Sequence, residues 1–304
     1  MLAVFADPKT DFVFKRIFGS EGHKRLLVEL LNALLELDEA HRIVDLEYLT
    51  PEQRIPVSEL KLSIVDVKCT DAQGTRYVVE MQVLNVEGFE KRVVYNASKA
   101  YVMQLRSADG YPELCDVVGV TICDFVLWPG DTGPAGRPVP MLSRWRMQEQ
   151  HTGALGLSQI QHVFLELPKY AAGPSPETTV ERWAYFFREA ENLDLIPPAL
   201  SDPPYREALE VARTATFSPL EWDAYDRAKI AEQDARGALS LAHRAGKAEG
   251  HREGLTAGLR RGLLTLCAAL GIDVSPEQRA SLDTLGEAEL QALSDRLLRD
   301  RRWS

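Results

Sequence analysis

The chain has 304 residues, of which 45% are hydrophobic and 26% are charged, which is typical of a globular protein that buries a sizeable core. Its formal net charge of −10 argues against a protein that coats nucleic acid by bulk attraction. No apolar run approaches the roughly 20 residues that span a bilayer, and the first residues lack the pattern of a signal peptide. We therefore expect a cytoplasmic protein without membrane association.

The cysteines give no sign of a metal site. Cys69, Cys115, Cys123 and Cys267 form no CxxC pair and have no histidine partners at ligand-like spacing, so we expect reduced, apolar side chains. The sequence also lacks a glycine loop of the form GxxxxGK[ST], and no nucleotide cofactor is expected.

The first predicted elements are two helices. One follows Thr10, with Asp11 in its first turn and Gly19 at its end. Ser20 is placed to cap the second. In that second helix leucines recur at helical spacing, at Leu26, Leu27, Leu30, Leu31 and Leu34.

Three strand-like segments follow, at Ile43–Tyr48, Lys61–Cys69 and Tyr77–Leu84. Turn-forming residues at 70–75 join the last two, with Gly74 available for a positive φ angle. The pattern predicts a β-hairpin.

Helices and strands then alternate. A helix is expected at Phe89–Arg106, a buried strand at Asp116–Leu127, a loop at 129–140, and two further strands at Leu142–Gln148 and His162–Leu167. Beyond Pro176 the chain is predicted to be helical, with buried Trp183, Phe186, Phe187 and Ala190.

Five glycines spaced four residues apart form the one clear repeat, at Gly246, Gly250, Gly254, Gly258 and Gly262. In a helix they share a face and leave a groove, although each destabilises the helix by roughly 1 kcal/mol relative to alanine. The repeat fits a close helix–helix contact, from which we expect a homodimer. A solvated flexible tail is the alternative.

Each strand of the predicted hairpin carries a carboxylate, Asp66 in the first and Glu80 in the second. Alternate residues share a face, which groups Asp66 with Lys68 and Glu80 with Gln82. A carboxylate among Val and Ile is costly unless it is paired or binds a metal. Two such acids close together would form an oxygen site for Mg²⁺ or Mn²⁺, which could activate water against a phosphodiester. From spacing alone, a wet outer face of the sheet is the alternative.

Several segments resemble the Rpn family of recombination-promoting nucleases, also described as transposases. They are TDFVFKRIFG with the leucine-rich helix after it, IVDVKCTDAQGTRYVVEMQ, RVVYNASKAYVMQL, HVFLELPKY and the EG-repeat tail. The family belongs to the PD-(D/E)xK superfamily, so the resemblance implies an α/β restriction-endonuclease-like core, a mixed central sheet flanked by helices. It implies a catalytic domain over residues 1–195 and a helical C-terminal region over 196–304, which we expect to mediate oligomerisation.

The resemblance also implies roles for individual residues. Asp66 is the motif aspartate, Glu80 the second metal ligand, and the Met81 carbonyl a further ligand. Gln82 stands where the superfamily usually has a lysine, although the resembled family itself tends to carry glutamine there. Asp11 matches the N-terminal aspartate of the family and is assigned to the catalytic group.

Four further residues are candidates for contact with phosphate. Lys15, Arg92 and Tyr95 match the family, and Lys15 is expected near the phosphate or a second metal ion. For Tyr95, simple packing is the alternative. Lys68 could supply the charge that Gln82 lacks, or it could be a surface lysine.

Two functions are compatible with these residues. The first is a Mg-dependent DNA endonuclease (an endodeoxyribonuclease) of low sequence specificity, acting in recombination or in defence against foreign DNA. Two carboxylates in apolar strands favour it. The alternative is a weak or inactive DNA-binding scaffold that acts through its oligomeric tail, favoured by Gln82 and by the net charge of −10.

Overall fold

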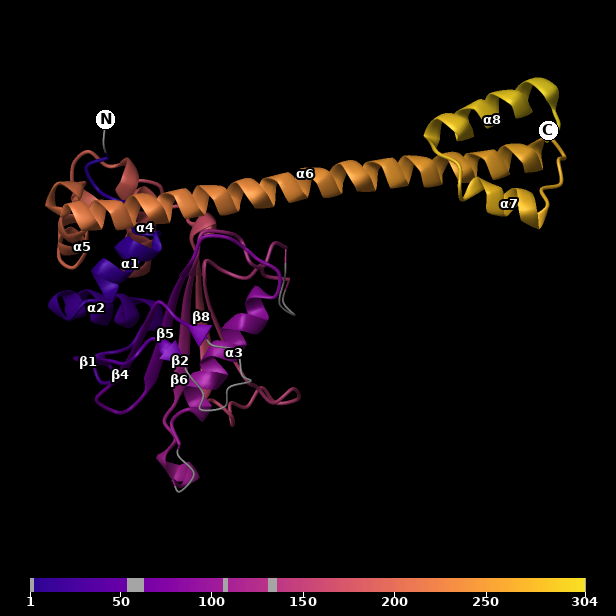
Figure 1. Ribbon diagram of the computed structural model, residues 1–304. Helices are drawn as coiled ribbons and strands as arrows, with labels where there is room; N and C mark the ends of the chain where they lie inside the picture. The colour runs from indigo at the N-terminus through magenta and orange to yellow at the C-terminus, as the bar shows by residue number, and fades with distance from the viewer. Residues whose placement is uncertain (1–2, 54–62, 106–108, 131–135, 304) are drawn as a thin grey trace. The chain divides into compact units, whose positions relative to one another are not determined.

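The computed structural model of the chain describes residues 3–53, 63–105, 109–130 and 136–303. They form two compact units, Met1–Glu232 and Gln233–Ser304 (Figure 1). The start of the predicted strand Lys61–Cys69, the end of the predicted helix Phe89–Arg106 and part of the predicted loop at 129–140 lie outside the described residues.

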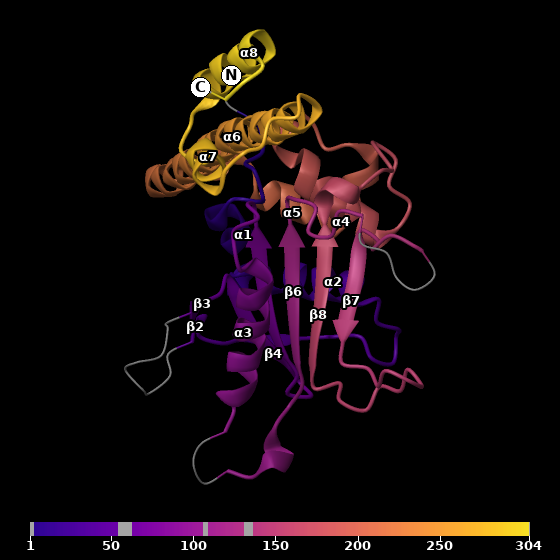
Figure 2. The same ribbon diagram turned by 90° about the vertical axis from the view of Figure 1, so that its right-hand side faces the viewer.

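A mixed sheet forms the centre of the first unit. In the described part of the chain its strands are β1 (Leu46–Tyr48), β4 (Val67–Asp71), β5 (Arg76–Gln82), β6 (Val117–Cys123), β8 (Ile160–Glu166) and β7 (Leu142–Arg146), in spatial order. β5, β6 and β8 are parallel, as Figure 2 shows for the last two, and the outer strands are antiparallel to their neighbours. The predicted hairpin is confirmed as β4 and β5. A small pair, β2 (Glu52–Gln53) with β3 (Ser63–Ile64), is separate.

Helices precede, interrupt and follow the strands. Those of the first unit are α1 (Asp11–Phe18), α2 (Lys24–Leu35), α3 (Phe89–Val102), α4 (Thr179–Glu189), α5 (Tyr205–Val211) and the beginning of α6 (Pro219–Ala269). Thr10 caps α1, because its hydroxyl accepts a hydrogen bond from the N–H of Val13. The expectation that Ser20 caps the second helix is wrong. A 3₁₀ turn over Glu21–His23 comes first, and α2 begins at Lys24.

The two faces of the sheet are covered by different helices. Figure 1 shows α1 and α2 on one side and α3 on the other. On the first side the strands pack beneath a cluster of aromatic rings that includes Phe18 and Trp183, whose centroids are 5.7 Å apart. On the other side Val78 packs with Ala97 and Ala100 of α3. This is the mixed sheet flanked by helices that the resemblance implied.

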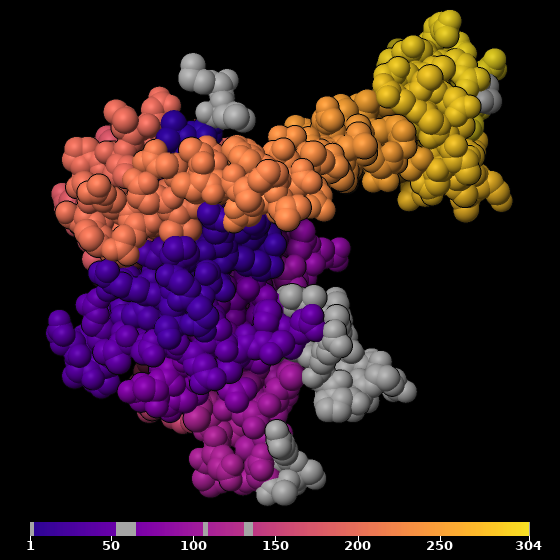
Figure 3. All heavy atoms as spheres, turned by 60° about the vertical axis from the view of Figure 1, so that its left-hand side comes forward, coloured from indigo at the N-terminus to yellow at the C-terminus, as the bar shows by residue number. Residues whose placement is uncertain are grey.

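The first unit extends well beyond residue 195, where we expected the catalytic domain to end. Leu200, Tyr205 and Leu209 are buried in its core. In α6, Tyr225 is also buried, and its hydroxyl accepts a hydrogen bond from the N–H of Asp7 at 3.1 Å. These contacts join the first turns of α6 to the N-terminal segment. In Figure 3 the first turns of α6 lie against that segment.

The second unit has a small core of its own, built by the end of α6 with α7 (Pro276–Leu282) and α8 (Glu287–Asp300). Its buried side chains are Leu263, Cys267, Leu282, Leu290, Leu293 and Leu297. The glycine repeat lies on α6, and a methyl group added at any of its five glycines would meet no described atom within 4 Å outside the adjacent residues and nearby backbone of the same helix. No helix in the described part of the chain is both long and apolar enough to cross a membrane.

Candidate active site

Asp66 lies at a break in the first strand of the hairpin. Its Oδ2 accepts a hydrogen bond from the N–H of Met81 at 2.7 Å. In the register that pairs Val67 with Val79, a continued strand would place Val65 opposite Met81. The carboxylate therefore takes the N–H that strand pairing would have used, a competition typical of aspartate. The unbroken strand expected through this position is wrong for that reason.

Glu80 lies on β5, on the side of the sheet that α3 covers. Only 7% of it is exposed, and its Oε1 accepts a hydrogen bond from Nδ2 of Asn96 on α3 at 2.6 Å. The predicted alternation holds along β5: Val78 packs with α3 residues, whereas Val79 belongs to the core on the other side. A wet outer face, the alternative from spacing, is therefore wrong for Glu80.

Both acids have raised pKa values, for which burial is the main cause. The pKa of Asp66 is raised to about 7: burial raises it most, and the negative charges of Asp11 and Glu80 also raise it, whereas the Met81 N–H and the charge of Lys15 lower it. The coulombic effect of Glu80 indicates that the two carboxylates are electrostatic neighbours. Such an arrangement favours bound cations, and raised carboxylate pKa values are typical of functional sites.

The pKa of Glu80 is raised by burial as well, and two neighbours on α3 oppose that effect. Asn96 lowers it through its hydrogen bond, and Arg92 lowers it through its positive charge. These neighbours are four residues apart, so they share one face of the helix. Asn96 was not among the candidates predicted from the sequence, although its position four residues after Arg92 could have indicated it.

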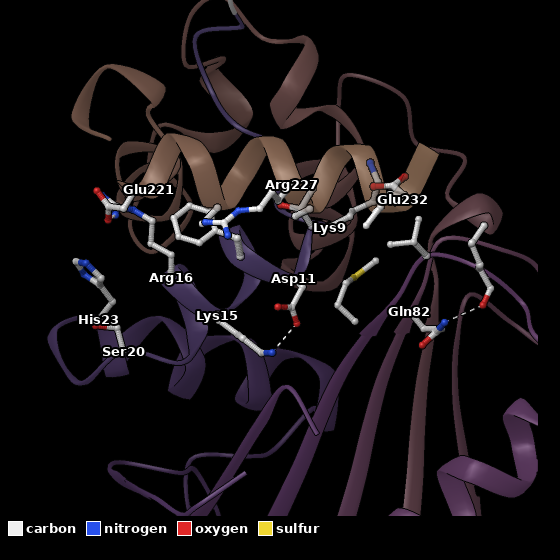
Figure 4. Close-up of a pocket in the computed structure, with 18 of the residues that line it drawn as sticks. Lys9, Asp11, Lys15, Arg16, Ser20, His23, Gln82, Glu221, Arg227 and Glu232 are labelled. Carbon is white, nitrogen blue, oxygen red and sulfur yellow. Dashed lines mark hydrogen bonds and ion pairs between the residues drawn. The ribbon is translucent and has the colours of Figure 1, made fainter. Parts of the chain in front are cut away.

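Helix α1 brings Asp11 and Lys15 to the same place. The Nζ atom of Lys15 lies 2.6 Å from Oδ1 of Asp11, as Figure 4 shows, and 3.9 Å from Oδ1 of Asp66. Because Asp11 and Lys15 are one helical turn apart, they project from the same face of α1. The ammonium group of Lys15 therefore lies between two carboxylates that come from different elements.

The amide of Gln82 is engaged at both ends. Its Nε2 donates to the carbonyl of Leu84 at 2.8 Å, and its Oε1 accepts a hydrogen bond from Arg92. Arg92 also lies over the ring of Phe89, with its Cζ 5.3 Å from the centroid. Arg92 thus fixes Gln82 at the end of β5, and its remaining donors can still meet an anion.

Two of the expected phosphate residues lie in other surroundings. Lys68 is 6% exposed, and its pKa is lowered by burial and by the positive charges of Arg76 and Lys99. The charged groups that shift the pKa of Lys68 are thus cations. Tyr95 is partly exposed, with Nζ of Lys99 lying 5.5 Å from its ring centroid.

A groove of 1110 Å³ is bounded by α1, the end of β5 and the first turns of α6. Asp11, Lys15, Met81 and Gln82 line it, and three of these side chains are labelled in Figure 4. Asp66 does not line it but contacts Lys15 and Met81, which do. The α6 wall could not be predicted from the sequence, because it lies more than 130 positions along the chain from the other residues that line the groove.

The oxygen donors at this site fit a hard divalent cation. Among the described residues, no three His, Cys, Asp or Glu side chains gather as a metal-binding group. The candidate donors are Asp66, Glu80 and the Met81 carbonyl, which lies on the Asp66 side because the N–H and C=O of a strand residue point the same way. Met81 and Asn96 each use one oxygen of a carboxylate. A second oxygen remains on each, which suits Mg²⁺, since Mg²⁺ often binds through one or two carboxylates and retains water.

The mixed sheet with a carboxylate at each arm of its hairpin defines a nuclease-type core of the PD-(D/E)XK class. A model of the PD-(D/E)XK nuclease family transposase matches residues 8–242, most of the chain, and the chain belongs to that family. No curated protein and no solved structure is similar enough to count as a match. The matched range extends past the first turns of α6, so it includes the groove as well as the sheet.

Proposed function

We propose that the protein is a DNA endonuclease that depends on Mg²⁺ or Mn²⁺, has low sequence specificity, and acts in recombination or in defence against foreign DNA. One observation carries the proposal: the half-buried Asp66 and the buried Glu80 are electrostatic neighbours with raised pKa values, and Asp66 contacts Lys15 and Met81, which line a groove. A phosphodiester is an anion, and its hydrolysis needs both an activated water and neutralisation of charge.

In the proposed site Asp66, Glu80 and the Met81 carbonyl hold the cation. When bound, a divalent cation would lower the pKa of a coordinated water and neutralise charge on the phosphate. Asn96 holds one oxygen of Glu80 in place, and the Met81 N–H holds one oxygen of Asp66. Both hydrogen bonds fix the carboxylates before a ligand arrives, which is how outer partners orient metal ligands.

Lys15 is proposed to supply the positive charge of the lysine that the superfamily usually has at the position of Gln82. Its ammonium group is 3.9 Å from Asp66 and reaches the groove from α1, whereas the Gln82 amide is engaged by Arg92 and Leu84. In the absence of a divalent cation Lys15 partly neutralises the carboxylates. With the substrate bound, the same charge is placed to stabilise the phosphate, and Asp11 orients Lys15 by their 2.6 Å contact.

The test is nicking of supercoiled plasmid by purified protein with Mg²⁺ or Mn²⁺. Asp66→Ala should abolish nicking and leave the far-ultraviolet circular dichroism unchanged, because it removes a metal ligand at the end of a strand. Asp109→Ala, at an exposed aspartate outside the site, is the matched control and should nick like wild type. Equal nicking by wild type and Asp66→Ala would falsify the assignment.

A second function, a DNA-binding scaffold without cleavage, is favoured by the engaged amide of Gln82 and by the net charge of −10. It predicts that wild type binds plasmid but does not nick it with either metal. A homodimer belongs to both proposals. For the nuclease, a two-fold pair places one site on each strand, and the uncovered glycine face of α6 is the proposed contact.

A further inference from the structure

The groove between α1, the end of β5 and α6 has charged, polar and apolar lining. Cationic groups lie at one part of it, from Lys15 on α1 and Arg227 on α6. Carboxylates and neutral polar side chains also line it, namely Thr10, Asp11, Ser20, His23, Gln82, Glu221 and Glu232. A further part of the lining is apolar, and its members share small size or hydrophobic character: Phe12, Met81, Val83, Leu84, Val86, Ala224, Ala228 and Ala231. A groove that bound only phosphate would not need this apolar part.

The α6 wall is built from small residues. Ala224, Ala228 and Ala231 recur at helical spacing on the face that lines the groove. Small side chains leave the groove wide, and Ala231 is exposed. Arg227 lies on the same wall, where its Nε donates to the Asp223 carbonyl at 3.0 Å. The terminal amino groups of its guanidinium remain for an anion.

The other charges of the groove are largely neutralised within the protein. Arg16 pairs with Glu221, and Lys9 contacts Asp7 at 3.2 Å. Lys15 is shared between two aspartates. Arg227 is therefore the groove cation best placed to bind a phosphate outside the metal site.

A groove with both cationic and apolar lining suits an unpaired DNA strand better than a duplex. The outside of a duplex presents phosphates and sugars, and its bases are stacked inside. An unpaired strand presents phosphates along one side and flat apolar bases along the other. Proteins that bind it combine cations for the backbone with apolar or aromatic surfaces for the bases. A groove with a cationic part and an apolar part matches the second form.

We propose that this groove binds an unpaired DNA strand, with a phosphate on Arg227 and bases against the apolar wall. The inference rests on the proposed nuclease function, to which it adds the substrate class. An end, a flap or an opened duplex then reaches the metal site along the groove, past Lys15 and Met81. The strand enters beside α6, whose alanines leave room for a base.

The experiment measures binding without cleavage, by fluorescence anisotropy of a labelled oligonucleotide in the full-length Asp66→Ala protein. We expect the single strand to bind about tenfold more tightly than the duplex of the same sequence, the order of one base–aromatic stack. Ala231→Trp should fill the groove and weaken single-strand binding by about tenfold or more. Arg227→Ala should lower the salt slope of log K by about 0.7, the value for one phosphate of a single strand.

Arg25→Ala is the matched control, because Arg25 is an exposed arginine on α2 that does not line the groove. It should leave single-strand affinity and salt slope unchanged. Equal or tighter duplex binding, or an Ala231→Trp protein that binds like its parent, would overturn the inference. Failure of the nuclease proposal looks different: wild type would bind the single strand with the expected dependence on Arg227 and Ala231 and would not cut it.

Discussion

The carboxylate of Asp66 is held in a position where its charged form is unfavourable. Its ordinary pKa is 3.8, and burial raises it to about 7 in the folded chain without a cation. Between these values the unfolded chain has lost the proton and the folded chain keeps it. Stability contributed by this group therefore falls as pH rises from about 4 to about 7, by at most about 4 kcal/mol.

Asp66→Asn should remove this pH dependence. The amide oxygen can still accept the Met81 N–H, and it carries no charge at any pH. In EDTA we expect the free energy of unfolding of the variant to exceed that of wild type by an amount that grows from pH 4 to pH 7 and then levels off. Urea titrations across that range measure it. A difference that does not change with pH would contradict the raised pKa.

The role proposed for the positive charge of Lys15 can be tested by moving that charge to position 82. Lys15→Met should lower nicking about 100-fold, in the range for loss of one charge-stabilising group. Adding Gln82→Lys to Lys15→Met should restore part of that activity, since it returns a lysine to the end of β5, two residues after Glu80. Metal affinity, measured by Mn²⁺ titration, should rise in Lys15→Met because the competing ammonium is gone. Unchanged affinity together with no rescue would leave Lys15 without this role.

At the scale of elements, local patterns predicted what local interactions determine. The hairpin, α1 and α4 followed from alternation, capping and helical spacing, and buried Trp183 and Phe187 were anticipated for α4. The acids Asp66 and Glu80 could be found because a charge in an apolar strand is visible in the sequence alone. Their partners could not, since Asn96 and the Met81 N–H meet them only after the chain has folded.

The breaks between elements were less predictable, because tertiary contacts decide them. β4 begins after Asp66, because the N–H of Met81 donates to the Asp66 side chain and not to the backbone of a paired strand. The domain extends to Glu232 for a similar reason. Lys229 of α6 lies 3.1 Å from the buried Asp7, whose pKa is lowered by Lys9 and Lys229 although burial opposes the shift. The sequence near residue 195 could not predict this domain boundary, because the boundary depends on contacts between residues more than 200 positions apart, such as Asp7 and Lys229.

At the scale of the whole molecule, the glycine face of α6 makes a prediction about assembly. No described residue packs against the five glycines from Gly246 to Gly262, and small residues let two helices approach closely. We expect a homodimer whose mass in solution halves when residues 241–304 are deleted. The deletion leaves every residue of the first unit in place, so its circular dichroism should still report a folded α/β core. Light scattering that finds one oligomeric state with and without this segment would contradict the prediction.

The junction of the N-terminal segment with residues 212–229 has a consequence for synthesis. Ala6 donates a backbone hydrogen bond to Ala212 at 2.8 Å, and Asp7 meets Tyr225 and Lys229. Because the α6 wall of the groove is among the last parts of the first unit to be translated, the nascent chain contains Asp66 and Glu80 before the groove is complete. Contacts this distant in sequence also form late in folding. A ribosome-bound fragment that ends before residue 219 therefore contains Asp66 and Glu80 but lacks the α6 wall of the groove.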